Sequence, residues 1–446
     1  MQDFLSKVTN TDAVLEQNII QIHQALLELA IAEDAVTDKL NNLTSACAIQ
    51  SFLNEHVTGS YLNQRTLLAR LEAKIESVLK IDAASRLSAA EEFTISVWAI
   101  HHSLFSSQFS TELLQIDFSR GSSGFKNLVQ LALIEPDQEN SLKMEIESLS
   151  KIEDTVSVAV QAQYEQHPYP RWFLLPQKSK TSYFDHLSAL FPAIDLPEIY
   201  KSPISVLSAG CGTGQEAAMI ARGRVVDKVI GLDLSATSLA YATRMANKER
   251  LENLSFVQGD ILRANLLEQM FAVIETTGVL HHMGDPMAGW NALVDCLEVN
   301  GLMKVGLYSA RASVEVNKAR DWILQQGYGS DNETICAVRQ EIFSMEQSNP
   351  LYTLRHSEDF YSISACRDLI FHEQEQSYTP TDLAKMLEKL NLRFIGFELP
   401  DQSIKQLYLQ KYPSDTAMTN LENWDHYDQQ HPDTFAGMLV FWCQKQ

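Results

Sequence analysis

Apolar residues in the first third of the chain recur at helical spacing. One stripe, at steps of four, three and four positions, consists of Val36, Leu40, Leu43 and Cys47. A second, at steps of three, four and three positions, consists of Leu68, Leu71, Ile75 and Val78. Such stripes are typical of amphipathic helices. Breaks rich in glycine and serine separate the stripes, and no fixed-period repeat is present. The pattern predicts an all-helical N-terminal domain over residues 1–150.

From Ile204 onward, short β-forming runs alternate with helical segments. This alternation favours an α/β fold with a layered sheet, here over residues 201–446. A helical insertion is expected after the fifth strand, at about residues 310–379, and a bridge over residues 151–200 contains the motif YEQHPYPRW. The predicted strands are Ile204–Ser208, Lys228–Asp233, Leu254–Gln258, Phe271–Thr277, Leu302–Tyr308, Leu392–Leu399 and Gly437–Cys443.

The charge balance argues against nucleic acid as a partner. The net charge is −22, from 57 acidic and 35 basic residues. Residues 1–150 contain 20 acidic and 10 basic residues, which leaves 37 acidic and 25 basic residues for the rest, so neither portion of the chain is a basic domain. We expect no signal peptide and no membrane contact, because the first segment is amphipathic and no apolar run approaches the roughly 20 residues that span a bilayer.

The six cysteines are scattered through the chain, and no two have the CxxC spacing of a metal site. We therefore expect no metal and no disulfide framework. A protein of the reducing cytoplasm fits this usage best.

The stretch ISVLSAGCGTGQ carries the most informative motif. Gly210, Gly212 and Gly214 follow a buried strand and precede a helix, where a ligand can press against bare backbone near the free N–H groups of the helix. A dinucleotide fingerprint needs its third glycine at position 215, which is Gln215. A nicotinamide oxidoreductase is therefore disfavoured.

Two acids follow the next two strands. Asp233 ends the run VIGLDLS, where its carboxylate can accept hydrogen bonds from both hydroxyls of a ribose, and Asp260 follows in QGDIL, next to where an adenine would lie. Because the carboxyl ends of parallel strands share one edge of a sheet, the loop and both acids are expected together. Each signal alone is weak, since an acid after a strand is often a helix cap; the combination is specific.

With these motifs in place, Ile204 to Ser309 resembles the core of the class I S-adenosylmethionine-dependent methyltransferases, through AGCGTGQ, GLDLS, QGDIL and GVLHHM. The run from Tyr164 to Trp442 further resembles a bacterial group of these enzymes that often carry tetratricopeptide-type helical N-terminal regions. The resemblance implies a Rossmann-like, seven-stranded sheet, S-adenosylmethionine as cofactor and in-line methyl transfer to a nucleophile.

The sequence departs from the family pattern at two places. Ser208 stands where the family usually has an acid, and Val299-Asn300-Gly301 replaces the usual Pro-Gly-Gly. The glycines and the ribose acid are retained, so the expectation of cofactor binding stands. The residues expected at the cofactor are Gly210, Cys211, Gly212, Thr213, Gly214, Gln215, Asp233, Leu234, Asp260, Ile261, Thr277 and Arg171, the last as a guanidinium clamp on the cofactor carboxylate.

Four side chains are candidates for catalysis. His281 and His282 lie just after the fourth strand and can serve as a general base, although a histidine pair there can also simply pack around the cofactor. Tyr169 lies in YEQHPYPRW, whose prolines fix an extended backbone, and the same motif can be a latch that pins the bridge onto the sheet. His372, beside Glu373 in the insertion, can act as an acid or base or can face water.

The expected substrate residues come from three segments. The bridge supplies one residue, and the end of the fifth strand supplies two, Tyr308, which can instead be a core residue, and Arg311, which can instead begin a helix. The insertion, which we interpret as a lid, supplies two more. These residues are Trp172, Tyr308, Arg311, Tyr361 and Arg367.

The acceptor is left open by the residues. A lid favours a small molecule, whereas a helical domain that grips a partner or forms a homodimer favours a peptide or protein side chain with an N or O nucleophile, which we prefer. A non-catalytic scaffold or S-adenosylmethionine-binding protein is the alternative from another class, and Ser208 is its only support.

Overall fold

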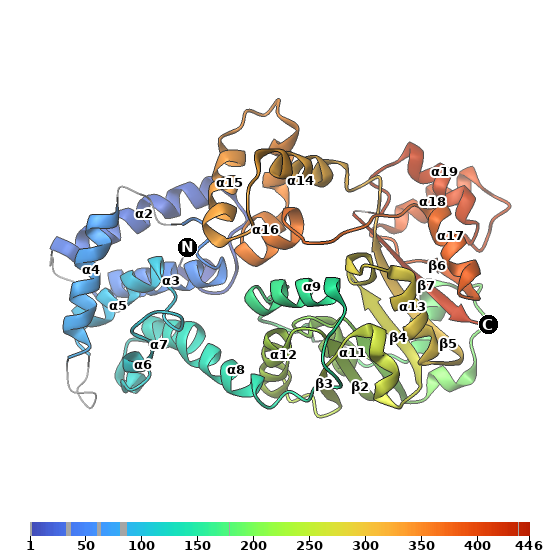
Figure 1. The fold of residues 1–446 in the computed structure, drawn as a ribbon, viewed down its shortest axis with the longest axis horizontal. Coiled ribbons are helices and arrows are strands. Elements are labelled where there is room, and N and C mark those ends of the chain that lie inside the picture. The colour runs from blue at the N-terminus through green and yellow to red at the C-terminus, as the bar shows by residue number, and fades with distance from the viewer. Residues whose placement is uncertain (1, 33–36, 60–63, 81–86, 178, 436) are drawn as a thin grey trace. The chain divides into compact units, whose positions relative to one another are not determined.

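The computed structural model describes residues 2–32, 37–59, 64–80, 87–177, 179–435 and 437–446 (Figure 1). The chain divides into two compact units. The first, the helical unit, combines Met1–Ser141 with Lys318–Phe371. The second, the sheet unit, combines Leu142–Asn317 with His372–Gln446.

The sheet unit is built on seven strands in the order β3-β2-β1-β4-β5-β7-β6. The first five strands in that order pair in parallel, and β7 is antiparallel to both β5 and β6. This is the Rossmann-like, seven-stranded sheet that the resemblance implied. The strands are β1 (Ile204–Ala209), β2 (Val226–Asp233), β3 (Leu254–Gln258), β4 (Phe271–Thr277), β5 (Leu297–Tyr308), β6 (Leu392–Phe397) and β7 (Met438–Lys445).

Helices cover both faces of this sheet, as the runs of apolar residues in its strands require. Consecutive residues of β1 show why: Val206 joins one core cluster, with α10 and α11, whereas Leu207 joins the other, with α13 and α17. The helices of the sheet unit are α9 (Thr155–Gln166), α10 (Tyr183–Leu190), α11 (Gln215–Gly223), α12 (Ala236–Lys248), α13 (Pro286–Asp295), α17 (Pro380–Lys389), α18 (Gln402–Lys411) and α19 (Leu421–Gln430), with short turns η4 (Glu198–Lys201), η5 (Ile261–Leu267) and η6 (Leu280–His282).

The seven predicted strands all exist, and the ends differ by at most five residues. The largest difference is at β5, which begins at Leu297 rather than Leu302 and includes the family departure Val299-Asn300-Gly301. Asn300 has a φ of 61°, a left-handed conformation that asparagine tolerates better than most residues. Its carbonyl accepts a hydrogen bond from the Tyr200 hydroxyl at 3.0 Å, so the irregular start of β5 is held by the bridge.

The helical unit contains no strand in its described residues. Helix α3 is central to it, since every side chain from Thr44 to Ser51 is buried. Leu71, Ile75 and Val78 are buried as their spacing predicts. Its elements are α1 (Gln2–Leu5), α2 (Ala13–Ala32), α3 (Asp38–Leu53), α4 (Arg65–Val78), α5 (Ala89–His101), α6 (Ser110–Leu113), η2 (Phe118–Arg120), α7 (Ser123–Val129), η3 (Gln130–Ile134), α15 (Asn332–Ser344), η7 (Pro350–His356), η8 (Glu358–Phe360) and α16 (Ile363–Ile370). Helices α8 (Glu135–Lys143) and α14 (Val314–Gln326) cross the boundaries between the units, so that Leu142, Lys143 and residues 314–317 belong to the sheet unit.

The insertion after β5 is helical, as expected, but residues 318–371 belong to the helical unit rather than to the α/β domain in which the sequence placed them. A buried ion pair explains this grouping. Arg339 of α15 donates from Nη1 and Nη2 to the two carboxylate oxygens of Glu16 in α2, at 2.9 and 2.6 Å. Both side chains are almost fully buried, at 1% and 6% exposure, so the insertion completes the core of the N-terminal helices.

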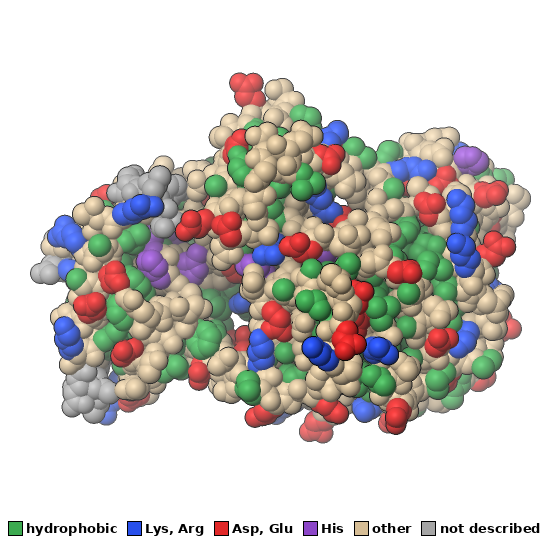
Figure 2. Space-filling model, in the orientation of Figure 1, with side chains coloured by type: hydrophobic (Ala, Val, Ile, Leu, Met, Phe, Trp, Pro, Cys, Tyr) green, Lys and Arg blue, Asp and Glu red, His purple; other side chains and the backbone are tan. Residues whose placement is uncertain are grey.

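None of the helices in the described part of the chain combines the length and the apolar character that a bilayer crossing requires. On the face drawn in Figure 2, lysine and arginine side chains are scattered among aspartate and glutamate rather than gathered into a basic stripe. This distribution agrees with the acidic composition.

Candidate functional site at the carboxyl edge of the sheet

The glycine loop joins β1 to α11 and is held in a left-handed conformation. Gly210, Gly212 and Gly214 have φ values of 70°, 52° and 79°, which side chains with a Cβ rarely adopt. Gly214 is the N-cap of α11, and no side chain caps this helix among the described residues. A Cβ on Gly212 would lie 2.9 Å from the carbonyl oxygen of Tyr169. The loop therefore requires glycine for both its conformation and its surroundings, and Gln215 begins the helix that follows.

Asp233, the last residue of β2, faces this loop. The backbone N–H of Gly212 donates to its Oδ2 at 2.7 Å, and that of Ser235 donates to Oδ1 at 2.9 Å. Burial raises the pKa of this carboxyl, while these two backbone hydrogen bonds oppose the rise. Each carboxylate oxygen can accept further hydrogen bonds, so capacity remains for a pair of hydroxyls.

The remaining residues expected at the cofactor occupy the ends of neighbouring strands. The Leu234 carbonyl accepts from the amides of Gln161 and Gln258, and the buried Asp260 accepts from the backbone of Leu262 at 2.9 Å, as the cap of η5. Ile261 is part of the main core cluster. Thr277 ends β4 beside Gly306, its register partner in β5. The cap position of Asp260 leaves its second oxygen outside that hydrogen bond.

The bridge motif YEQHPYPRW is fastened to the glycine loop by hydrogen bonds. The indole Nε1 of Trp172 donates to the Thr213 carbonyl at 2.8 Å, and the Thr213 hydroxyl donates to the Pro170 carbonyl. Trp172 is buried, and its own carbonyl accepts from the hydroxyl of Tyr241 in α12. These contacts are those of the latch that the sequence offered as one interpretation. They leave the expected role of Trp172 at the substrate as a prediction.

Arg171 and Cys211 lie beside the same loop. The guanidinium carbon of Arg171 is 6.0 Å from the ring centre of Tyr241, at the outer limit of a cation–π contact. Burial raises the pKa of the Cys211 thiol well above its usual range, so this cysteine stays protonated and unreactive at neutral pH.

Glu165, which the sequence reading did not single out, is also part of this region. Its Oε1 accepts from the backbone N–H of Ala236 at 2.6 Å, at the start of α12, and its carboxylate also binds Lys143 and the Thr237 hydroxyl. Against the effect of burial, the hydrogen bonds from Lys143 and Thr237 lower the pKa of Glu165. The signal for this role was its place in YEQHPYPRW, but only the fold shows that it caps the helix after Asp233.

Beyond the glycine loop, aromatic side chains from separate segments of the sheet unit gather around η6. Val279, which precedes this turn, lies against the loop, because a Cβ on Gly210 would be 2.4 Å from its Cγ1. The rings of His281 and Tyr308 are 4.0 Å apart, and those of His281 and His282 are 4.2 Å apart. Both histidines are buried. The turn therefore brings two predicted catalytic residues and one predicted substrate residue together.

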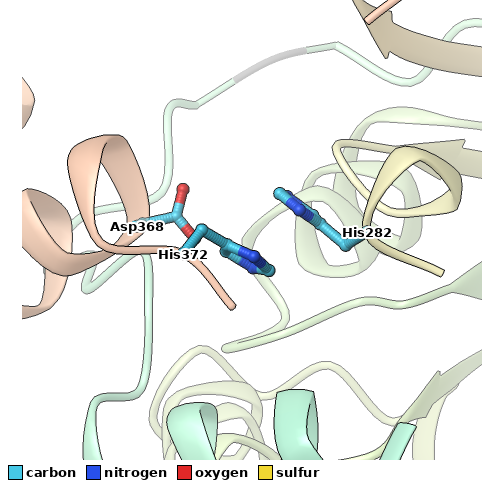
Figure 3. Close-up of side chains that lie close together, drawn as sticks. All are labelled: His282, Asp368 and His372. Atoms are coloured by element: carbon cyan, nitrogen blue, oxygen red, sulfur yellow. The ribbon is translucent and has the colours of Figure 1, made fainter. Parts of the chain in front are cut away.

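His282 also stacks on His372, although 90 positions separate them in the sequence. Their ring centres are 3.6 Å apart and their planes differ by 17°. Figure 3 shows these two imidazoles reaching toward one another, His282 from η6 and His372 from the segment after α16. The third side chain drawn, Asp368, belongs to the helical unit. The Tyr164 hydroxyl lies 3.3 Å from Nε2 of His372, so the bridge motif reaches this cluster as well.

The backbone partners of the two histidines fix which nitrogen bears the proton. Nδ1 of His282 lies 2.9 Å from the Gln374 carbonyl oxygen, which can only accept, so Nδ1 donates and the neutral ring carries its lone pair on Nε2. Nδ1 of His372 accepts from the backbone N–H of Gln374 at 3.1 Å, which places the proton of neutral His372 on Nε2. His282 is thus poised as a proton acceptor at Nε2, and His372 as a donor there.

The other predicted substrate residues lie elsewhere. Arg311 forms ion pairs with Asp428 and Asp425 of α19, at 2.6 and 3.1 Å. Tyr361 and Arg367 belong to the helical unit, where the first donates to the Arg355 carbonyl and the second to the Ser330 carbonyl. Their role at a substrate stays a prediction. His372 and Glu373 follow α16 in an irregular segment rather than on a helix.

The region that holds this site is similar in sequence to known proteins. The family described as "Methyltransferase domain" matches residues 201–351, which include the glycine loop, Asp233, Asp260 and η6. An uncharacterized protein of Synechococcus sp. is 27% identical over 271 residues, covering 56% of this chain and 62% of that protein. A tRNA (guanine-N(7)-)-methyltransferase of Rubrobacter xylanophilus is 29% identical over 106 residues, covering 23% of this chain and 44% of that protein.

Among solved structures, that of PKMT2 from Rickettsia typhi is similar with a TM-score of 0.46 and 16% identity, covering 62% of this chain and 54% of that chain. The present chain thus spans less than two thirds of the length of these relatives. The family match includes the loop and both strand-end acids, and the seven-stranded sheet is the one expected around them. Residues 201–351 are therefore similar to a methyltransferase domain, and the sheet that holds them has the Rossmann-like, seven-stranded arrangement of the class I, S-adenosylmethionine-dependent methyltransferases.

Proposed function

We propose that this protein transfers the methyl group of S-adenosylmethionine to a nitrogen or oxygen nucleophile of a peptide or protein side chain. The hydrogen bond between the Gly212 N–H and Asp233 carries the proposal, because it sets the carboxylate for a ribose beside a loop of bare backbone. The methyltransferase-domain match over the same residues supports it.

The residues of the edge fit this cofactor. Gly212 and Gly214 keep side chains away from the loop, and the uncapped N-terminus of α11 follows it. Asp233 retains acceptor capacity for the ribose hydroxyls, and the second carboxylate oxygen of Asp260 offers an acceptor for an adenine amino group. When bound, the cofactor supplies a sulfonium whose methyl group is already activated for attack.

The chain's own contribution is then alignment and proton removal. Orientation of the two reactants can account for about 7–11 kcal/mol of the barrier. An oxygen or protonated nitrogen nucleophile must also lose a proton, and Nε2 of His282 can accept it because Nδ1–H is held by the Gln374 carbonyl. The stacked ring of His372 and the ring of His281 restrict the orientation of His282.

The proposal of a peptide or protein acceptor rests on the helical unit. The helical unit adds Met1–Ser141 and Lys318–Phe371 to the sheet unit that holds the glycine loop, and such an additional helical part favours a macromolecular acceptor or a second copy of the chain. A small-molecule acceptor is the alternative. A reducing cytoplasmic location is part of the proposal, because all six cysteines are free thiols and none forms a disulfide.

Two measurements test the proposal. Isothermal titration should show micromolar binding of S-adenosylmethionine, which Asp233→Ala weakens by more than tenfold through the loss of charged hydrogen bonds worth about 1.5–3 kcal/mol. Asp227→Ala is the matched control, because Asp227 lies exposed on the same strand. Unchanged affinity in Asp233→Ala would contradict the ribose assignment, and no binding by the natural protein would favour a scaffold.

The second measurement identifies the acceptor. The protein is incubated with S-adenosylmethionine carrying a radiolabelled methyl group and an extract of its host. Label in acid-precipitable protein supports a protein acceptor, and label in the soluble fraction supports a small molecule. His282→Gln should lower the rate about a hundredfold if His282 is the base, whereas the exposed His426→Gln should not. An unaffected rate in His282→Gln would exclude His282 as the base.

A further inference from the structure

A cluster of buried and partly buried charged side chains lies beside the strand and the helix that flank the glycine loop. Its centre is Glu275 of β4, which is 5% exposed. Glu275 is the register partner of Ser208 in β1, so the two side chains lie on the same face of the sheet. Because Ser208 comes two residues before Gly210, the carboxylate is one strand away from the chain that leads into the loop.

Lys304 of β5 connects this carboxylate to the helix that leads out of the loop. Its Nζ lies 2.8 Å from Oε1 of Glu216, the second residue of α11, and 3.7 Å from Oε2 of Glu275. Glu398, which follows β6, is 3.9 Å from the same ammonium. The cluster therefore adjoins the strand before the glycine loop, through Glu275, and the helix after it, through Glu216.

The remaining groups around Glu275 come from α10 and the last strand. The Tyr183 hydroxyl donates to Oε1 of Glu275 at 2.6 Å. The Trp442 indole donates to Glu398 at 2.6 Å, and His186 lies 4.0 Å from the same carboxylate. Arg224 lies over the Tyr183 ring, at 5.7 Å from its centre.

The cluster has more carboxylates than cations. Lys304 is the cation within 4 Å of Glu216, Glu275 and Glu398, Arg224 lies farther off over the Tyr183 ring, and His186 adds a positive charge only when protonated. Burial and the neighbouring Glu216 and Glu398 raise the pKa of Glu275 to about 7, although Lys304 and the Tyr183 hydroxyl oppose that rise. The same carboxylates raise the pKa of Lys304 despite its burial, so the lysine stays charged. A change in pH near neutrality therefore changes the charge beside the strand and the helix that flank the loop.

We propose that Glu275 is a specificity-determining residue that favours the positively charged methyl donor over the uncharged thioether product. The donor carries one more positive charge than the product, at its sulfonium. A buried carboxylate beside the strand that leads into the loop attracts that charge through protein of intermediate dielectric, and a neutral carboxyl does not. Ser208 leaves the strand before the loop without an acid, so Glu275 supplies the negative charge from the next strand. This inference rests on the proposed function.

The test compares the Kd values of S-adenosylmethionine and S-adenosylhomocysteine by isothermal titration between about pH 5.5 and about pH 8.5. In the natural protein, the ratio of product Kd to donor Kd should rise by roughly three- to tenfold across this range, the effect of one buried unit charge. In Glu275→Gln the ratio should stay near its low-pH value. A ratio that rises equally in both proteins would overturn the proposal.

Other groups at the edge also titrate and must be separated from Glu275. Protonation of His281, His282 or His372 would oppose binding of a cation with the same pH dependence. His282→Gln is therefore measured alone and combined with Glu275→Gln, and the effect of Glu275→Gln should persist in the His282→Gln background. Its absence there would assign the discrimination to the histidines.

A second variant keeps the test decisive if Glu275→Gln does not fold. Tyr183→Phe removes a hydrogen bond that stabilises the carboxylate, so the midpoint of the change in the ratio should move to higher pH while its end values remain. A merely structural cluster would weaken donor and product equally at every pH, and that result would also overturn the inference. Failure of the natural protein to bind either ligand would instead contradict the proposed function.

Discussion

The two units of this chain bury titratable side chains of opposite type, bases in one and an acid in the other. The helical unit encloses His23 and His101, whose rings are 6.4 Å apart, and the sheet unit encloses Glu275. Burial lowers the pKa of both histidines to about 3 and raises that of Glu275 to about 7. In each case the neutral form is favoured inside the protein. Because one group is a base and the other an acid, the two units respond to pH with opposite signs.

Each unit compensates the burial of its charged groups in a different way. In the helical unit the buried carboxylate of Glu16 is matched by one bidentate partner, Arg339, and burial favours the uncharged forms of His23 and His101. The sheet unit places three carboxylates around one lysine and depends on a retained proton. A closed ion pair is suited to structure alone, whereas a cluster with a surplus charge can respond to a ligand.

The largest change in stability is expected when the ion pair of the helical unit is broken. Arg339→Met leaves Glu16 buried without its partner and should lower the free energy of unfolding by about 3–5 kcal/mol. Urea denaturation measures the loss, and hydrogen exchange should localise it to α2, α15 and α16. The double variant Glu16→Leu with Arg339→Met should recover most of the stability. A loss in the double variant as large as in Arg339→Met would contradict this account.

The second largest effect is a loss of stability of the folded protein at acidic pH. The pKa of His23 and His101 is lower in the folded state than the ordinary value near 6.5, so the unfolded chain binds more protons. Their stabilising contribution is present above pH 6.5 and is lost as the pH falls below that value. Between about pH 7.5 and about pH 5 the loss should be about 4 kcal/mol for the pair.

Replacement of both histidines by phenylalanine provides the comparison. The double variant His23→Phe with His101→Phe should keep the protection of α2 and α5 from hydrogen exchange at about pH 5, whereas the natural protein should lose it. Replacement of the exposed His426 should change nothing. Equal acid sensitivity in the double variant and the natural protein would show that other groups unfold the unit.

The smallest effect has the opposite sign and belongs to the sheet unit. The pKa of Glu275 is raised from 4.5 to about 7 on folding, so its contribution is fully present below pH 4.5 and is lost as the pH rises through 7. Between about pH 5 and about pH 8 this should lower the free energy of unfolding by about 2 kcal/mol. Glu275→Gln should remove this dependence, measured by urea denaturation at each pH, and a slope that survives in the variant would refute it.

Much of the sheet unit could be predicted from the sequence. Its strands are short, continuous apolar runs, since parallel strands are buried on both faces, and β3 and β4 were predicted with the bounds that the structure gives them. Gly212 and Gly214 predict the loop, because few other residues tolerate its φ values. The place of Asp233 at the end of β2 predicts that it lies beside this loop. These features are local, and local patterns record them.

What the sequence could not reveal depends on contacts between distant segments. Apolar periodicity indicated that residues 318–371 are helical, but only the Arg339 pair with Glu16 shows which helices they join. Glu275 resembled an ordinary strand residue, because its partners come from four other segments. His282 gained its orientation from Gln374 and His372, which are more than eighty positions away. Periodicity determines what a segment becomes, whereas burial and pairing across the fold decide the charge and direction of each side chain at the site.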